Sequence, residues 1–167
     1  MNQATALLKD YCRYNLWANK NLADLLNTFD NDFLTKEVKS SYPSLRKTCF
    51  HIWDAEYVWY SRLNGTSPTT FPSNTFGADV HPCGFIKQSE EFLSFIEKQD
   101  DDYFEGKTSF SAFDGTKFTQ ENSGIIMHVM NHSSFHRGQL VMMLRNLGYR
   151  GTMPRTDMII YLRDQNR

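Results

Sequence analysis

Apolar side chains recur at steps of three and four residues through four long segments of this sequence, and this periodicity constrains the fold more than any other feature. The first segment runs from about Thr5 to Thr28, with apolar positions at Leu7, Tyr11, Tyr14, Ala18, Leu22 and Leu25. Steps of this length place side chains on one face of an α-helix. The segment is therefore predicted to be an amphipathic helix.

Three later segments repeat the pattern. A second helix is predicted to begin after Pro43, with Ser44 as its N-cap, and to end at Asn64-Gly65. A third is predicted from about Phe85 to Asp102, and a fourth from about Asn122 to Leu147. Each has an apolar stripe at helical spacing, so four helices are available to pack against one another.

The connections between these helices have distinct compositions. Three of the five prolines lie between Thr66 and Gly84, which predicts an irregular loop. Asp114-Gly115 separates two short runs, Thr108 to Phe113 and Thr116 to Gln120, and this arrangement predicts a β-hairpin. The apolar run from Met158 to Leu162 predicts a last helical turn or two.

Together these elements predict an all-α fold, a four-helix bundle with a small β-hairpin before the last long helix. The chain of 167 residues is expected to form a single domain, 1–167, and 40% hydrophobic residues are enough for one core. The long second-to-third connection leaves the order and direction of the helices open.

Charge and cysteine content exclude several classes of protein. Lys+Arg number 18 and Asp+Glu 19, so no basic field exists to attract nucleic acid or an anionic membrane. We find no apolar stretch long enough to cross a bilayer and no secretory signal at the N-terminus. The three cysteines are widely spaced, which is typical of reduced thiols. A cytoplasmic location is expected.

Four of the five histidines mark two predicted helices. His51 lies on the second helix, and His128, His132 and His136 follow one another at steps of four on the fourth. Side chains at i and i+4 share a helix face, so two imidazoles can bind one metal ion. All three on the fourth helix cannot share it, because His128 and His136 would lie about 12 Å apart along the axis.

The apolar stripe of the fourth helix selects a pair. At about 100° per residue, the stripe centres close to His136, with His132 about 40° and His128 about 80° away. His51 lies on the shoulder of the second helix's stripe and could complete a three-histidine site. Histidines at this spacing are also common as hydrogen-bonded core residues, and His128 remains an alternative ligand, so the spacing leaves these interpretations open.

Four motifs in order along the chain resemble the DinB family of DinB/YfiT-like metalloproteins. They are Tyr14–Asn19 (YNLWAN), His51–Glu56 (HIWDAE) with Trp59, Asn131–Gln139 (NHSSFHRGQ) and Asp157–Arg163 (DMIIYLR). The resemblance implies a four-helix bundle, usually a homodimer, in which three histidines hold a divalent metal. Carried over by position, the ligands would be His51, His132 and His136.

The expected function is that of a metal-dependent enzyme acting on a small molecule. Family resemblance suggests either a thiol S-transferase that uses a low-molecular-weight thiol or a hydrolase. The metal is expected to be zinc or nickel, with iron as an alternative. The competing hypothesis is a non-catalytic bundle that binds a metal or a small ligand. Asp54 and Gln139 are weak catalytic candidates, and a solvated surface carboxylate is the simpler interpretation of Asp54.

Overall fold

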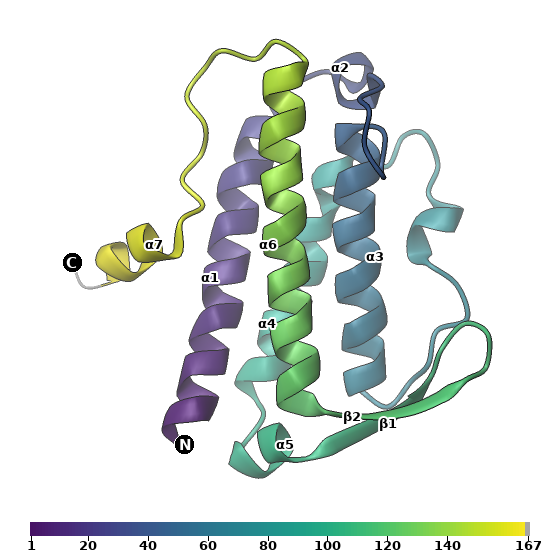
Figure 1. Ribbon diagram of the computed structural model, residues 1–167, viewed down its shortest axis with the longest axis vertical. Helices are drawn as coiled ribbons and strands as arrows, with labels where there is room; N and C mark the ends of the chain where they lie inside the picture. Colours follow the sequence, from purple (N-terminus) through teal and green to yellow (C-terminus); the bar gives the residue numbers. More distant parts are fainter. Residues whose placement is uncertain (166–167) are drawn as a thin grey trace.

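Four long helices pack side by side in the computed structural model, which describes residues 1–165 (Figure 1). They are α1 (Gln3–Leu26), α3 (Leu45–Leu63), α4 (Phe85–Glu97) and α6 (Asn122–Asn146). The expected all-α bundle is thus confirmed. The expected single domain, 1–167, stays a prediction, and its last two residues lie outside the described part.

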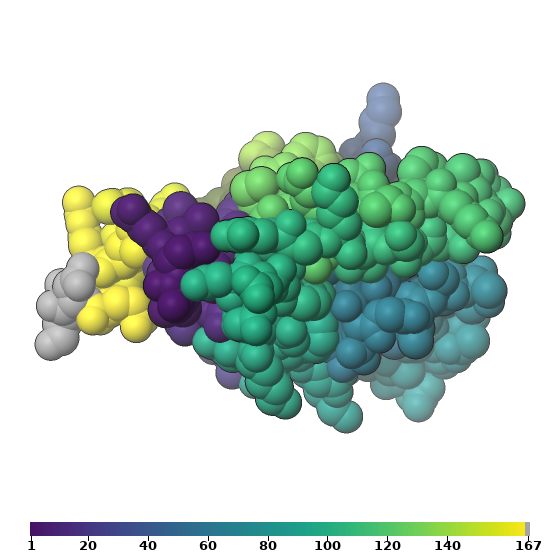
Figure 2. Space-filling model, turned by 90° about the horizontal axis from the view of Figure 1, so that it is seen from below, coloured from purple at the N-terminus to yellow at the C-terminus, as the bar shows by residue number. Residues whose placement is uncertain are grey.

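Short elements connect and flank the bundle. The remaining elements are α2 (Asn31–Thr35), η1 (Pro72–Thr75), η2 (Pro82–Gly84), α5 (Asp101–Glu105), β1 (Lys107–Ser111), β2 (Lys117–Glu121) and α7 (Met158–Gln165). The strands pair antiparallel, with Phe110 opposite Phe118. Seen from below, the hairpin extends past the helices on one side, and the C-terminal segment lies beside α1 on the other (Figure 2).

The helices follow an order that the sequence left open. α1 packs against α4 and α6, and α3 packs against the same two helices, so α1 and α3 occupy opposite corners of the bundle. α3 and α4 run in one direction, opposite to α1 and α6 (Figure 1). Parallel neighbours require a connection that returns along the bundle, and the Pro-containing segment 66–84 supplies it.

Most predicted helix ends are correct. The Ser44 side chain accepts a hydrogen bond from the Lys47 amide, as an N-cap does, and Gly65 follows α3 with φ of 82°. The third helix, however, ends at Glu97 rather than Asp102. There Asp100 accepts from the Tyr103 amide and begins the separate helix α5. A strong N-cap within the apparent pattern therefore divides the predicted helix in two.

Two of the three hydrophobic clusters in the described residues lie on either side of a polar layer; the third joins Tyr14 and Ala18 of α1 to Tyr161 of α7. Of the first two, one joins the start of α3 to the end of α6, and the other joins the end of α3 to the start of α6 and to the hairpin. Between them lie buried polar side chains of all four long helices, listed as Asn15, Asn19, Glu56, Ser89, Ser133 and Arg137. The apolar stripes thus form the core, and the polar layer interrupts it at mid-height.

The structure also bears on the cysteines and on membrane-spanning segments. Cys12, Cys49 and Cys83 are buried free thiols, and burial raises the pKa of each, to about 12 for Cys83. They are therefore protonated and inert at neutral pH. Over residues 1–165, none of the helices has the length and apolar character needed to cross a membrane.

Candidate metal centre

Three imidazoles from two neighbouring helices converge at one point. The Nε2 atom of His132 lies 2.9 Å from Nε2 of His51 and 3.1 Å from Nε2 of His136. All three ligand atoms lie within 4.8 Å of one another. The structure therefore brings together the three histidines that the family resemblance selected, and it does so through the same ring nitrogen of each.

Local structure explains this convergence. His132 and His136 lie one turn apart on α6, and α3 packs against that face with His51 pointing across. The Tyr42 ring stacks on the His51 imidazole at a centroid distance of 3.9 Å, with the planes 18° apart. The same ring meets His136 edge-on at 5.7 Å. Tyr42 thereby limits the orientations available to both imidazoles.

Gln139 sets the tautomer of His136. Its Oε1 lies 2.7 Å from Nδ1 of His136, and an amide oxygen only accepts hydrogen bonds, so Nδ1 carries the proton. The Nε2 atom of His136 then presents a lone pair to the other two histidines. This is the arrangement that orients a histidine for metal binding. Gln139, which the sequence offered as a catalytic candidate, thus lies within hydrogen-bond distance of one of the three histidines.

Burial keeps the three rings neutral. It lowers the pKa of His51 to about 4, with the nearby His136 adding to the effect. It lowers the pKa of His132 to about 3, again reinforced by the other histidines. Burial also lowers the pKa of His136, although the hydrogen bond to Gln139 opposes the shift. At neutral pH all three rings can therefore act as metal ligands, which must be deprotonated.

The donor set fits a divalent metal ion. Nitrogens about 2.0–2.1 Å from a tetrahedral ion are about 3.3 Å apart, close to the 2.9 Å and 3.1 Å that separate Nε2 of His132 from the Nε2 atoms of His51 and His136. Without an ion, a hydrogen bond between two of these nitrogens uses one proton and one lone pair. The three facing nitrogens therefore cannot all be satisfied by one another. Within residues 1–165, Nδ1 of His132 is buried and has no hydrogen-bond partner. The cluster is thus suited to binding a cation.

Two other sequence candidates lie elsewhere. The His128 ring is 5.9 Å from the His132 ring and lines a separate cavity beside Trp59. Asp54 was expected to be a surface carboxylate, and this is wrong. It is buried and accepts hydrogen bonds from the amide and hydroxyl of Ser73, so it anchors the loop that contains η1. In the described residues it makes no hydrogen bond to the three histidines.

Sequence reasoning did not identify Glu56 as a central residue. Its carboxylate is fully buried and accepts hydrogen bonds from Asn15, Asn19 and Ser133 on one oxygen and from Ser89 on the other. Arg137 donates to the same two asparagines. Asn15 and Asn19 follow each other by four residues inside the apolar stripe of α1, and this spacing was the available signal.

The fold and the three-histidine cluster together define a class of helical-bundle proteins with a histidine site between two helices. A sequence model of the DinB family matches residues 1–166, and the chain belongs to that family. It is 23% identical over 160 residues to Protein DinB of Bacillus subtilis (strain 168), a match that covers 89% of this chain and 90% of that protein.

Solved structures share the fold. YfiT from Bacillus subtilis, described as a probable metal-dependent hydrolase with an unusual four-helix bundle topology, matches with a TM-score of 0.64 and 14% identity, covering 89% of this chain and 91% of YfiT. A DinB-like protein from Bacillus cereus matches with a TM-score of 0.62 and 18% identity, covering 86% of this chain and 91% of that chain. At these identities the likeness concerns the fold alone.

Proposed function

We propose that His51, His132 and His136 bind one divalent cation and that the chain is a metal-dependent enzyme acting on a small molecule. The observation that carries this proposal is the convergence of three neutral Nε2 atoms within 4.8 Å. Gln139 holds one of them in the ligand tautomer, and Tyr42 stacks against another. Three protein ligands are typical of catalytic sites, whereas structural sites are closed by four.

Hydrolysis is the reaction that we propose first, because the structurally similar YfiT is described as a probable metal-dependent hydrolase. A divalent cation held by three neutral imidazoles would keep its full charge and supply a Lewis acid that lowers the pKa of a water or thiol. The protein's part is to hold the three imidazoles neutral and oriented, which burial, Tyr42 and Gln139 achieve.

Thiol transfer is the second candidate, and one observation favours it. Over residues 1–165, no carboxylate accepts a hydrogen bond from the three histidines, so none of the acids is placed there as a general base for water. A thiol needs less help, since its pKa is already near 8.5. The thiol would have to come from outside, because the three cysteines of the chain are buried.

Metal analysis of the purified protein tests the site. We expect about one equivalent of zinc or nickel, or alternatively iron, and at least about tenfold less metal after replacing any one of His51, His132 and His136 by Ala. His128→Ala is the matched control, because it removes a histidine of the same helix and should leave metal content unchanged. Full metal content in His132→Ala with native circular dichroism would contradict the assignment.

Cobalt substitution then separates the reactions. If a thiol such as cysteine, glutathione or a bacterial sugar thiol ligates the cation, a charge-transfer band should appear in the near ultraviolet. If ester or amide substrates turn over and no thiol changes the spectrum, hydrolysis is supported. If neither result is obtained with a fully loaded protein, the non-catalytic binding module replaces both proposals.

We also propose that the chain forms a homodimer through one face of α1 and α6. These two helices carry exposed apolar side chains, including Leu7 (64% exposed) on α1 and Phe135 (62%) and Met142 (61%) on α6. Exposed apolar side chains of this size are typical of interaction surfaces, and two-fold dimers are the commonest assemblies. Sedimentation should show a dimer at micromolar concentration and a monomer after Phe135→Asp. A wild-type monomer would contradict the proposal.

A further inference from the structure

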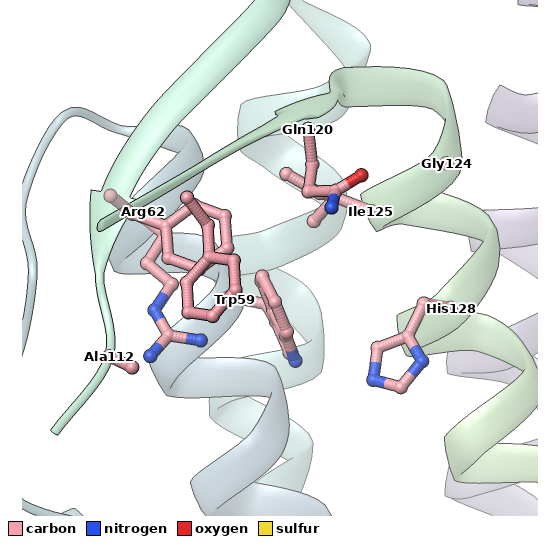
Figure 3. Close-up of a pocket in the computed structure, with 9 residues that line it drawn as sticks. Trp59, Arg62, Ala112, Gln120, Gly124, Ile125 and His128 are labelled. Atoms are coloured by element: carbon pink, nitrogen blue, oxygen red, sulfur yellow. The ribbon is translucent and has the colours of Figure 1, made fainter. Parts of the chain in front are cut away.

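A cleft of about 400 Å³ lies beside the three-histidine site, between the hairpin and the facing ends of α3 and α6. Six of its lining residues matter here, namely Trp59, Arg62, Phe110, Phe118, Ile125 and His128. Figure 3 shows Arg62 and Trp59 on one side of this cleft, Gln120 and Ile125 above it and His128 on the opposite side. The volume is in the range of small-molecule sites.

Arg62 is a buried cation without an anionic partner among residues 1–165. Its side chain is only 8% exposed, and its guanidinium carbon lies 4.5 Å from the Trp59 ring and 4.6 Å from the Phe110 ring. One Nη atom donates to the carbonyl of Ser111 at the long distance of 3.4 Å, and Nε is buried without a partner. In the part of the chain that the structure describes, no carboxylate lies within ion-pair distance of it.

Two other arginines of the bundle have the partners that Arg62 lacks. Arg13 forms an ion pair with Glu97 at 2.7 Å, and the buried Arg137 donates to two asparagines that also bind Glu56. Buried charges in proteins are normally paired, because their desolvation is costly. Stacking on aromatic rings compensates only part of this cost, and it leaves the N–H edge of the guanidinium free to bind an anion.

The His128 ring stands between the cleft and the three-histidine site. It lies 5.4 Å from the Trp59 ring and 5.9 Å from the His132 ring, and the residues that line the cleft do not include His51, His132 or His136. Along α3, Arg62 is eleven residues after His51, which corresponds to about 16 Å. A molecule held by Arg62 would therefore reach the three histidines only by extending past His128 over about this distance.

We propose that Arg62 binds a carboxylate or phosphate group of a small molecule whose apolar body lies against Trp59 and Phe110. Flat, rigid guanidinium donors favour such groups, which accept two hydrogen bonds side by side. We take this molecule to be the substrate, and that step rests on the proposed metal-dependent function. The anion site itself does not, because none of its residues is a ligand of the metal centre.

The test uses metal-free protein labelled with 5-fluorotryptophan, whose Trp59 fluorine signal is assigned by Trp59→Phe. The full chain is titrated with benzoate, phenyl phosphate and the neutral benzamide. We expect at least one of the two anions to shift the Trp59 signal at about tenfold lower concentration than benzamide, since charged hydrogen bonds contribute about 1.5–3 kcal/mol. The benzoate and phenyl phosphate arms distinguish a carboxylate site from a phosphate site.

Variants of Arg62 complete the test. Arg62→Met keeps the apolar stem and should weaken anion binding about tenfold or more, whereas Arg62→Lys should retain part of it. Arg46→Met is the matched control, because Arg46 also stacks on a ring, that of Phe50, but lies outside the cleft. If Arg62→Met does not fold, two comparisons still test the proposal. Arg62→Lys should bind the anion more weakly than wild type, and wild type should bind the anion more tightly than benzamide.

Equal binding of benzoate, phenyl phosphate and benzamide, or unchanged anion binding in Arg62→Met, would overturn the proposal. The His132→Ala protein separates it from the proposed function. It should bind no metal but should bind the anion as wild type does. If wild type binds the anion and no metal, the anion site stands and only the identification of its ligand as substrate falls.

Discussion

Two polar regions use neighbouring residues of the same helices, yet they differ in how their polar atoms are satisfied. On α6, His132 and His136 face the metal centre, whereas the next residues, Ser133 and Arg137, face the polar layer around Glu56. The Glu56 carboxylate accepts four hydrogen bonds from side chains of α1, α4 and α6. The three histidines instead direct Nε2 atoms at one another.

This difference separates a structural role from a ligand site. Around Glu56 four donors satisfy one carboxylate, and such a buried polar network holds helices in register, although one Nη atom of Arg137 in this layer has no hydrogen-bond partner among residues 1–165. Where three imidazole nitrogens converge, as at the histidine cluster, a cation is the partner that would satisfy all three at once. A rotation of about 100° along α6, the step between adjacent residues, therefore divides the residues of the polar layer from the residues that we propose bind a metal ion.

The largest expected effect is on the polar layer. Glu56→Ala removes the acceptor of four hydrogen bonds and the counter-charge of the buried Arg137, so we expect the free energy of unfolding to fall by about 3–5 kcal/mol. Urea denaturation of metal-free protein measures it. Glu90→Ala is the control, because the ion pair between Glu90 and Lys20 is exposed. This substitution should lower the free energy of unfolding by about 1 kcal/mol or less. A similar small loss for Glu56→Ala would remove the distinction between the two regions.

Metal should stabilise the protein only through the histidine cluster. At a zinc concentration about one hundred times the dissociation constant, the free energy of unfolding should rise by about 2.7 kcal/mol. His132→Ala should lose this gain at the same zinc concentration, and His128→Ala should keep it. If zinc stabilised His132→Ala as much as wild type, the ion would be binding elsewhere.

A smaller effect is expected from the residue that orients a ligand. Gln139→Leu keeps the side-chain volume but removes the oxygen that accepts from His136 Nδ1, so metal affinity should fall about tenfold. Competition with a chelator measures it, and Gln120→Leu on the hairpin serves as the control. Because Gln139 acts only through His136, Gln139→Glu should restore the affinity. An unchanged dissociation constant in Gln139→Leu would show that the hydrogen bond does not orient the ligand.

A further effect is the pH dependence of the metal-free protein. The pKa values of His51 and His132 are lowered to about 4 and about 3, so below pH 6.5 the unfolded chain takes up protons before the folded chain does. The free energy of unfolding should therefore decrease as pH falls from about 6.5 toward 4. The double variant His51→Ala/His132→Ala should show a shallower decrease between these pH values, and an identical slope would contradict the neutral, buried rings.

Much of the fold follows from local sequence signals. The caps at Ser44 and Gly65 and the Asp114-Gly115 turn act within a few residues, and each is where the sequence placed it. The end of the third helix was wrong because the Asp100 cap competes with an apolar pattern that continues beyond it. The burial of Asp54 was also missed, because its partner Ser73 lies in a loop 19 residues away in sequence.

The sequence by itself determined the four amphipathic helices, the hairpin and the spacing that places His132 and His136 on one face, since these depend on backbone geometry over one or two turns. Only the tertiary structure decided that α3 and α4 run parallel, that Glu56 is buried among four helices and that Arg62 is enclosed by the hairpin without an anion. These features depend on contacts between residues far apart in the chain, and no periodicity within a single helix encodes which partner will face it.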